Sequence, residues 1–294
     1  MLHRKKTAAF IALISLAGVS FSGCSLFGIG SNNDERNTLS DTTSSVVSIN
    51  EYDKGDLASL FLSNMDISRH QYNWSCLKND DTGISYEGDD RFYIRKGIDV
   101  SSHQEEIDWE AVKADGIEFA FIRIAYRGYS DDGVLLPDEY ALDNIRKATA
   151  AGIDVGVYVF SQAVNEEEAI EEARFAIDLL GDTKIPLPVV YDPENINDAE
   201  ARTDDLSADQ ITKNTIAFCE KIREAGYSPA IYSNLKWEVL YFNMEKLKEY
   251  DFWYADYNSE PKTPCNFRFW QYSTKGTVKG IKGNADLNVE FIKK

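Results

Sequence analysis

The sequence predicts an α/β fold, a single flattened and irregular (β/α) barrel of the TIM type over residues 93–294. Apolar runs that fit buried strands alternate with amphipathic runs that fit helices throughout this region. Strand–helix alternation indicates a parallel sheet, and so many units in succession indicate that the sheet closes on itself. Near the C-terminus the strand-like runs at residues 252–257 and 267–273 have no helix between them, so we expect the barrel to be irregular there.

The predicted elements have recognisable boundaries. Asp108 is placed to cap the first helix of the barrel, and Gly116, Gly152, Gly181 and Gly226 stand where helices should end. No G-x-G-x-x-G follows a strand, so a dinucleotide cofactor is not expected. The predicted strands cover residues 93–100, 119–127, 154–161, 187–192, 229–234, 252–257 and 267–273, and the predicted helices cover residues 108–116, 138–152, 166–181, 207–226 and 236–250.

The first 23 residues form a targeting segment. A basic start, MLHRKK, precedes an apolar run that is too short to span a bilayer comfortably, and Ser22 and Gly23 lead to Cys24. This order resembles a bacterial lipoprotein signal, which implies cleavage before Cys24 and acylation of that cysteine. The alternative is an ordinary secretory signal with an incidental cysteine. We therefore expect an extracytoplasmic protein that is anchored to the cell membrane through Cys24.

Two further segments precede the barrel. Residues 24–56 are rich in Ser, Thr, Asn and Asp, which is typical of a flexible, disordered tether. Residues 57–92 form an N-terminal extension with a short helix-like patch. Cys219 lies in a helical pattern and is expected to be a buried small hydrophobic residue. Cys76 and Cys265 have no zinc-site spacing, and a disulfide between them is left open.

The charge of the chain limits its partners. Net charge is −18 at pH 7, and removal of residues 1–23 takes away three basic residues and no acid, which gives −21. Nucleic acid is therefore not expected as a partner, because phosphate binding needs clustered Lys and Arg. We expect a monomer. A hydrophobic content of 43% is sufficient for a large core.

Acidic residues follow the predicted strands. In α/β barrels, chemistry collects at the C-terminal ends of the strands. Asp99, Asp192 with Glu194, Asp256 and Asp286 all stand where we expect strands to end. Closure of a barrel brings its first and last strands together, so Asp99 and Asp286 should face one another. Each aspartate alone could equally be a turn former or a helix cap.

Asp192 and Glu194 are the strongest candidates for catalysis. Residues two apart in an extended chain point the same way, and Pro193 favours the extended conformation of the residue before it. Two like charges on one face raise the pKa of at least one of them, as a general acid for a glycosidic oxygen requires. Without the targeting segment the chain has two histidines, His70 and His103, so a histidine-rich metal site is excluded and a Ser–His–Asp triad is poorly supported. We expect no metal and no cofactor.

Aromatic residues gather at the same strand ends. Tyr and Trp combine an apolar ring with a polar group, which suits the apolar face and hydroxyl edge of a sugar. Most aromatic residues of a barrel belong to its core, and we expect about half of this set to line the cleft. The set contains Tyr158, Phe160, Tyr191, Tyr232, Trp253, Tyr254, Tyr257, Trp270 and Tyr272.

The motifs between residues 97 and 291 resemble family 25 of the glycoside hydrolases, the lysozyme-type N-acetylmuramidases. GIDVSSHQ, IDW, GVYVF, D-x-E, IYSN, WYADY, FWQYS and G-x-A-D-L-N occur in the order of that family. The resemblance implies hydrolysis of the β-1,4 bond between N-acetylmuramic acid and N-acetylglucosamine in peptidoglycan. It implies Glu194 as proton donor, Asp192 as the partner that orients the substrate acetamido group, and Asp99 and Asp286 as flanking acids.

Substrate contacts are expected from residues at the same rim, namely Tyr158, Tyr232, Trp253, Asp256 and Gln271. The carboxyl spacing alone leaves retaining and inverting mechanisms open, since the side-chain directions decide it. The resemblance favours a retaining mechanism in which the substrate's own acetamido group is the nucleophile.

Three residues depart from the family's pattern. Glu105 stands where the family often has Gly, Pro193 where it has an aromatic or aliphatic residue, and Ala285 where Val is common. None of them removes a catalytic carboxylate. Two alternatives stay open: a non-catalytic lipoprotein that binds the cell wall, and a glycosidase of another N-acetylhexosamine polymer. The expected partners are the glycan strands of peptidoglycan, and the membrane through Cys24.

Overall fold

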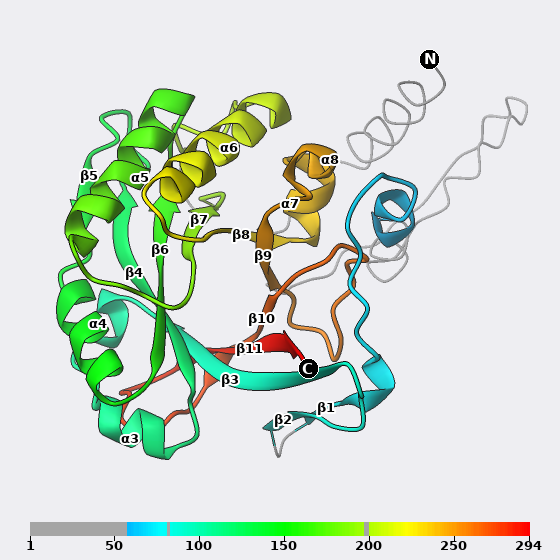
Figure 1. Ribbon diagram of the computed structural model, residues 1–294. Coiled ribbons are helices and arrows are strands. Elements are labelled where there is room, and N and C mark those ends of the chain that lie inside the picture. Colours follow the sequence, from blue (N-terminus) through cyan, green and yellow to red (C-terminus); the bar gives the residue numbers. More distant parts are fainter. Residues whose placement is uncertain (1–57, 81–82, 197–199) are drawn as a thin grey trace, which may run out of the picture. The chain divides into compact units, whose positions relative to one another are not determined.

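The centre of the molecule is a barrel of strands, seen in a computed structural model that describes residues 58–80, 83–196 and 200–294 (Figure 1). The main sheet has nine strands in the order β3-β11-β10-β9-β8-β7-β6-β4-β5, and β3 also pairs with β4. This additional pairing closes the sheet and leaves β5 as a short appendage on β4. The irregular α/β barrel predicted from the sequence is confirmed.

The elements fall into three groups. The barrel sheet consists of β3 (Phe92–Val100), β4 (Phe119–Arg127), β5 (Leu135–Pro137), β6 (Asp154–Ser161), β7 (Val189–Pro193), β8 (Pro229–Asn234), β9 (Asp251–Ala255), β10 (Phe269–Gly276) and β11 (Ala285–Lys293). The helices are η2 (Ser102–Gln104), α3 (Trp109–Ala114), α4 (Ala141–Ala150), α5 (Glu166–Leu180), α6 (Ala208–Glu224), α7 (Leu235–Leu240) and α8 (Met244–Leu247). The extension contains η1 (Trp74–Cys76), β1 (Leu77–Asp80) and β2 (Gly83–Tyr86).

The predicted targeting segment, Cys24 and the tether at residues 24–56 lie outside the described residues. Residues 58–62 are helical. Within the described ranges, no helix has the length and apolar character that a membrane span requires. The three cysteines in these ranges are free, so Cys76 and Cys265 form no disulfide, and Cys219 is buried in α6 as predicted.

Helix boundaries follow the predicted signals with one correction. The Asp108 side chain accepts a hydrogen bond from the Ala111 N–H and caps α3, and the glycines predicted to end four helices all have positive φ. The single helix predicted over residues 236–250 is wrong. Two short helices, α7 and α8, replace it, because the Asn243 side chain accepts from the Lys246 N–H and starts a new helix.

The strands of the barrel sheet are parallel except for β5 and β11 (Figure 1). β11 runs antiparallel to both of its neighbours, β3 and β10. This corrects the prediction that Asp286 ends a strand, because Asp286 lies near the start of β11. The reversal of β11 nevertheless places that start at the C-terminal end of β3, where Asp286 is the register partner of Asp99.

Alternate residues of each strand face inward and outward, as the two-residue period of a strand requires. Val190 belongs to a buried cluster formed by residues of the barrel strands, whereas its neighbour Tyr191 packs against Phe218 of α6, with ring centroids 4.9 Å apart. At two positions inside the barrel only glycine leaves room for a neighbouring aromatic ring. A Cβ on Gly97 would lie 2.3 Å from the Phe119 ring, and one on Gly156 would lie 2.5 Å from the Phe121 ring.

The helices cover one part of the outer face of the barrel, and the N-terminal extension covers another part. Helices α4, α5 and α6 lie against β4, β6 and β7 (Figure 1). The strands β10 and β11 have no helix of their own after them, and aromatic residues of the extension pack here instead. Tyr72 stacks on Phe291 at 3.9 Å between centroids and donates a hydrogen bond to the Phe267 carbonyl, while Trp74 contacts Trp270 edge-on.

Candidate active site

Four carboxyl groups meet at the C-terminal end of the parallel strands. Asp99 lies near the end of β3 opposite Asp286 of β11. Asp192 lies in β7, and Glu194 directly follows it. Asp192 shares the inward face with Val190, and Glu194 continues that alternation. The sheet order thus brings together the four acids that the sequence predicted as catalytic.

Burial of these carboxyl groups raises all four of their pKa values. For Asp192 the largest cause is burial, followed by the charges of Glu194 and Asp99. Burial also raises the pKa of Glu194, to which Asp286 adds, and that of Asp286 itself. For Asp99, burial and then Asp286 raise the pKa to about 7. Because the acids cannot all be charged at once near neutrality, the cluster holds protons that it can donate.

The Asp192 carboxyl group lacks one hydrogen-bond partner. Its Oδ1 atom is buried and has no partner among the described residues. A buried acceptor without a donor is costly, so such atoms are rare in folded proteins and call for an explanation. Here the atom belongs to the acid cluster, where the N–H group of a bound molecule would supply the missing donor.

Two amide side chains hold Asp99 in place. Gln271 Nε2 and Asn288 Nδ2 each donate to Asp99 Oδ2 at 2.8 Å. Gln271 Nε2 also reaches Asp286 Oδ2 at 3.4 Å. Gln271 was predicted to bind substrate, and the structure shows that its amide is engaged with the acids. Asn288 was missed, although it stands two residues after Asp286 and therefore shares its face of β11.

The amides are in turn oriented by aromatic side chains. The Trp253 indole N–H donates to Asn288 Oδ1 at 2.7 Å. The Tyr232 and Tyr257 hydroxyls donate to Gln271 Oε1 at 2.9 and 2.8 Å. Trp253 is only 1% exposed, so it supports the floor of the site from below and presents no open face to a ligand.

Arg123 is a second residue that the sequence analysis missed. It follows Phe119 and Phe121 in the inward register of β4, and its positive charge lowers the pKa of Asp192 against the effect of burial. The guanidinium group is fixed by bonds from Nε to Asp138 Oδ2 at 2.9 Å and from Nη2 to Ser102 Oγ at 3.0 Å. The signal in the sequence was a charged residue inside the apolar run FAFIRIAYR.

The remaining predicted contacts differ in their positions. Tyr158 and Tyr232 are buried, and each ring packs against Trp253 in the cluster that fills the interior of the barrel. Asp256 has its carboxylate engaged by its own loop, since it accepts from the N–H groups of Asn258 and Lys262. Asp256 thus organises the loop after β9.

The set of nine aromatic residues is divided by the pleat of the strands. Tyr191, Tyr254 and Trp270 belong to the large hydrophobic cluster outside the barrel, whereas Tyr158, Tyr232 and Trp253 belong to the interior cluster. Tyr257 is 57% exposed at the rim and is the most accessible ring beside Gln271. Period-two alternation could have predicted this division.

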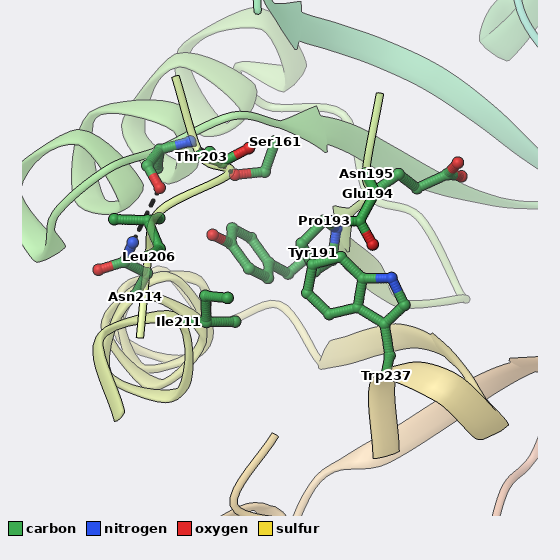
Figure 2. A pocket seen from close by; sticks show the side chains of 11 residues that line it. Ser161, Tyr191, Pro193, Glu194, Asn195, Thr203, Leu206, Ile211, Asn214 and Trp237 are labelled. Atoms are coloured by element: carbon green, nitrogen blue, oxygen red, sulfur yellow. Dashed lines mark hydrogen bonds between the residues drawn. The ribbon is translucent and has the colours of Figure 1, made fainter. Parts of the chain in front are cut away.

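A small cavity lies behind Glu194. It has a volume of about 20 Å³, and its lining includes Tyr191, Pro193, Thr203 and Trp237 (Figure 2). The Glu194 carboxyl group turns away from the other lining side chains (Figure 2). This volume suits one water molecule and no sugar ring. A larger hollow of about 510 Å³, lined partly by residues of β4, β5 and α5, contains none of the four acids.

The backbone at Glu194 is fastened from this rear side. Gln162 Nε2 donates to the Glu194 carbonyl at 2.8 Å, and the Thr203 hydroxyl donates to Gln162 Oε1 at 2.9 Å. Gln162 is almost fully buried. These bonds connect the segment after β7 to the end of β6 and fix where Glu194 enters the cluster.

Comparison with known proteins finds one family along most of the chain. The sequence profile of glycosyl hydrolases family 25 matches residues 98–281. Lysozyme M1 of Streptomyces globisporus is 30% identical over 203 residues, which cover 66% of this chain and 66% of that protein. The autolytic lysozyme of Clostridium acetobutylicum is 27% identical over 194 residues, which cover 66% of this chain and 55% of that protein.

The fold also matches solved structures. The modular autolysin LytC of Streptococcus pneumoniae superposes with a TM-score of 0.61 at 23% identity, over 74% of this chain and 52% of that one. The same autolysin in complex with a synthetic peptidoglycan ligand gives a TM-score of 0.58 at 24% identity, with the same coverage. At these identities the likeness concerns the fold. The chain spans about half of the autolytic lysozyme and of LytC.

Proposed function

The chain belongs to glycosyl hydrolase family 25, and from this membership we propose that it hydrolyses the β-1,4 bond between N-acetylmuramic acid and N-acetylglucosamine in peptidoglycan. The family makes the chain a glycoside hydrolase. The choice of bond is supported by the names of two relatives, which are lysozymes, and by the peptidoglycan ligand bound to LytC. The roles of individual residues are argued from the site.

The observation that carries the proposal is the convergence of four carboxyl groups with raised pKa values, of which Asp99 and Asp192 are buried and Glu194 and Asp286 are half-buried. Glu194 is the general acid, since burial and the charge of Asp286 keep it protonated at a pH where an exposed glutamate is charged. It donates its proton to the glycosidic oxygen as the bond from that oxygen to the muramic acid C1 breaks. The leaving sugar departs as a neutral alcohol.

Asp192 assists the substrate's acetamido group. Its buried Oδ1 has no partner in the described part of the chain, and an acetamido N–H would provide the donor. Held in this way, the acetamido carbonyl oxygen attacks C1 while the positive charge that develops is stabilised by Asp192. Water then attacks C1 as the bond from C1 to the acetamido oxygen breaks and the acetamido group is restored. Glu194 takes up the proton that the water loses, and the product keeps the configuration of the substrate.

Replacement of Glu194 by Gln tests the proposal directly. The full-length protein, purified in detergent, is incubated with isolated peptidoglycan, and the products are reduced with borohydride and analysed by mass spectrometry. We expect muramitol ends from the native protein and a rate about 10²- to 10⁴-fold lower from Glu194→Gln. NMR of the first product should show the retained anomer.

Glu200→Gln is the matched control, because Glu200 is an exposed carboxyl group of the segment that follows Glu194. It should keep the native rate. An inverted anomer would exclude acetamido assistance. Reducing ends of N-acetylglucosamine alone would contradict the muramidase assignment.

The same purified protein can be used to distinguish two other functions from the proposed one. A non-catalytic protein that binds the wall would pull down with peptidoglycan and release no new ends, but pure binding requires no protonated acid in the cleft. A glycosidase of another N-acetylhexosamine polymer would cleave chitin oligosaccharides faster than peptidoglycan. We further propose that the protein acts outside the cytoplasm from a lipid anchor at Cys24, as the targeting segment indicates.

A further inference from the structure

The protonation of the acid cluster is constrained by a chain of hydrogen bonds with a fixed direction. Trp253 begins it, because an indole N–H is a donor and cannot accept. Its partner at 2.7 Å is Asn288 Oδ1. If the Asn288 amide were turned over, its nitrogen would face the indole N–H, donor against donor. The orientation of Asn288 is therefore set by Trp253.

This orientation carries through to Asp99. With Oδ1 facing Trp253, Asn288 Nδ2 points to Asp99 Oδ2 at 2.8 Å, and an amide nitrogen only donates. Gln271 Nε2 approaches the same oxygen at 2.8 Å. Two donors occupy Asp99 Oδ2, which leaves no room there for a proton and favours the charged carboxylate.

The orientation of the Gln271 amide also depends on the charge of Asp99. Its Oε1 accepts from the Tyr232 and Tyr257 hydroxyls. A hydroxyl can also accept, so the tyrosines alone would allow either amide orientation. In the reverse orientation Oε1 would face Asp99, which is tolerable only if Asp99 carries a proton. The charge on Asp99 thus selects the orientation of Gln271, and Asn288 supports that charge.

We propose that Asn288, oriented by Trp253, and Gln271, oriented by Tyr232 and Tyr257, are positioning residues that stabilise the negatively charged form of Asp99 within the acid cluster. Neither amide needs to touch the substrate. The negative charge of Asp99 is inferred from the hydrogen-bond donors around it, and this inference does not depend on the catalytic activity. Its consequence for hydrolysis rests on the proposed function.

The groups around Asp99 make this support necessary. Burial is the largest influence and raises the Asp99 pKa, as do Asp286 and, more weakly, Glu194, while the two amides lower it, with a balance at about 7. The charged and titratable groups that face the cluster from the packed elements are Asp286 of β11, Asp192 and Glu194 at the end of β7, Arg123 of β4, Tyr158 of β6, Tyr232 of β8 and Tyr257 after β9.

A charged Asp99 has a specific effect on the two residues proposed to act on the substrate. Its charge raises the pKa of Asp192, after burial and Glu194. The pair formed by Asp192 and Glu194 therefore retains a proton at a pH where a neutral Asp99 would allow the pair to lose it. The two amides therefore act on the reaction through Asp99. They determine the pH range in which the Asp192–Glu194 pair holds its proton.

The test is the titration of Asp99 in Asn288→Leu, which keeps the side-chain volume and removes the donor. Full-length protein labelled with [¹³C]aspartate is titrated by NMR, and the Asp99 signal is assigned by its loss in Asp99→Asn. We expect the midpoint to move upward by about one pH unit, which is about a tenfold change in proton affinity. Trp253→Phe should move it in the same direction, because Asn288 is then free to turn.

The chain contains a matched control. Asn144 of α4 is also buried and also accepts from an indole, that of Trp109 at 3.1 Å, but its Nδ2 has no partner among the described residues. Asn144→Leu repeats the change without any contact to Asp99 and should leave the midpoint in place. If Asn288→Leu fails to fold, Gln271→Leu provides the second donor deletion.

Activity separates the two proposals. The basic limb of the kcat/KM profile should move downward in Asn288→Leu, because a neutral Asp99 lets the Asp192–Glu194 pair lose its proton at a lower pH, and it should remain in place in Asn144→Leu. An unchanged midpoint in folded Asn288→Leu and Gln271→Leu would overturn the role of the amides. If the midpoint shifts in Asn288→Leu but the native protein releases no muramitol ends, the role of the amides is upheld and the proposed function is contradicted.

Discussion

Glu105 is a strained residue beside the site. Its backbone has φ of 54° and ψ of −132°, and it is the only non-glycine residue of positive φ within the described ranges. It directly follows the capping box formed by Ser101 and Gln104, just after the strand that carries Asp99. Side chains with a Cβ adopt such a conformation at a cost of about 1–3 kcal/mol.

Replacement of Glu105 by Gly should stabilise the protein by about 1 kcal/mol, since the relief of strain exceeds the greater entropy of glycine in the unfolded chain. Urea unfolding followed by circular dichroism measures the change. Glu106 is the control, because it is also exposed and its φ is not positive. Glu106→Gly should lower stability, and an equal loss in Glu105→Gly would show that no strain is present.

Much of the site could be predicted residue by residue. The two-residue period was sufficient to place Asp192 and Glu194 on one face. Closure of a barrel predicted that Asp99 and Asp286 face one another, but it took Asp286 as the end of a strand, whereas the reversal of β11 makes Asp286 lie near a strand's start. The bonding of Gln271 could not be predicted, because a polar residue at a strand end can face a ligand or another side chain with the same sequence pattern. Asn288 was missed for the same reason, since its role depends on Trp253, which lies on a different strand.

At the scale of elements, the extension replaces missing helices. The alternation of strands and helices stops before β10, which predicted irregularity, but the sequence did not indicate what covers the exposed strand faces. Tyr72 and Trp74 cover them through contacts with Phe267, Trp270 and Phe291. The direction of β11 also escaped prediction, because a strand carries no local mark of being parallel or antiparallel.

Tyr72→Ala should destabilise the protein by about 2–4 kcal/mol, because it removes the stack on Phe291 and the hydrogen bond to the Phe267 carbonyl. The free energy of unfolding in urea is the measurement. Tyr129 is the control, since it is 47% exposed, and Tyr129→Ala should change stability by less than about 0.5 kcal/mol. Equal effects would show that the extension contributes no packing energy.

At the scale of the whole molecule, net charge and attachment act against each other. The chain without residues 1–23 would carry a net charge of −21, and anionic polymers of a cell wall repel such a protein. Attachment to the membrane through Cys24 would offset this repulsion, because a tether holds the enzyme at a high effective concentration near the wall.

Cys24→Ala should release the protein from the membrane fraction, since no lipid can then be attached. Fractionation of cells followed by immunoblotting gives the result, with Cys76→Ala as a control that keeps the anchor. Retention of Cys24→Ala in the membrane fraction would contradict lipidation at this cysteine.

The seam between β3 and β11 also determines when the protein becomes an enzyme. The hydrogen bond from Asn288 to Asp99 joins residues 189 positions apart, and pairings over such a separation form slowly because a long loop must be ordered first. A ribosome makes β11 after the other strands of the described barrel sheet, so Asp286 and Asn288 are absent while those strands are already present. Before that moment a nascent chain lacks Asp286 and Asn288 and cannot assemble the acid cluster. Synthesis itself therefore delays activity until the final strand has joined the first.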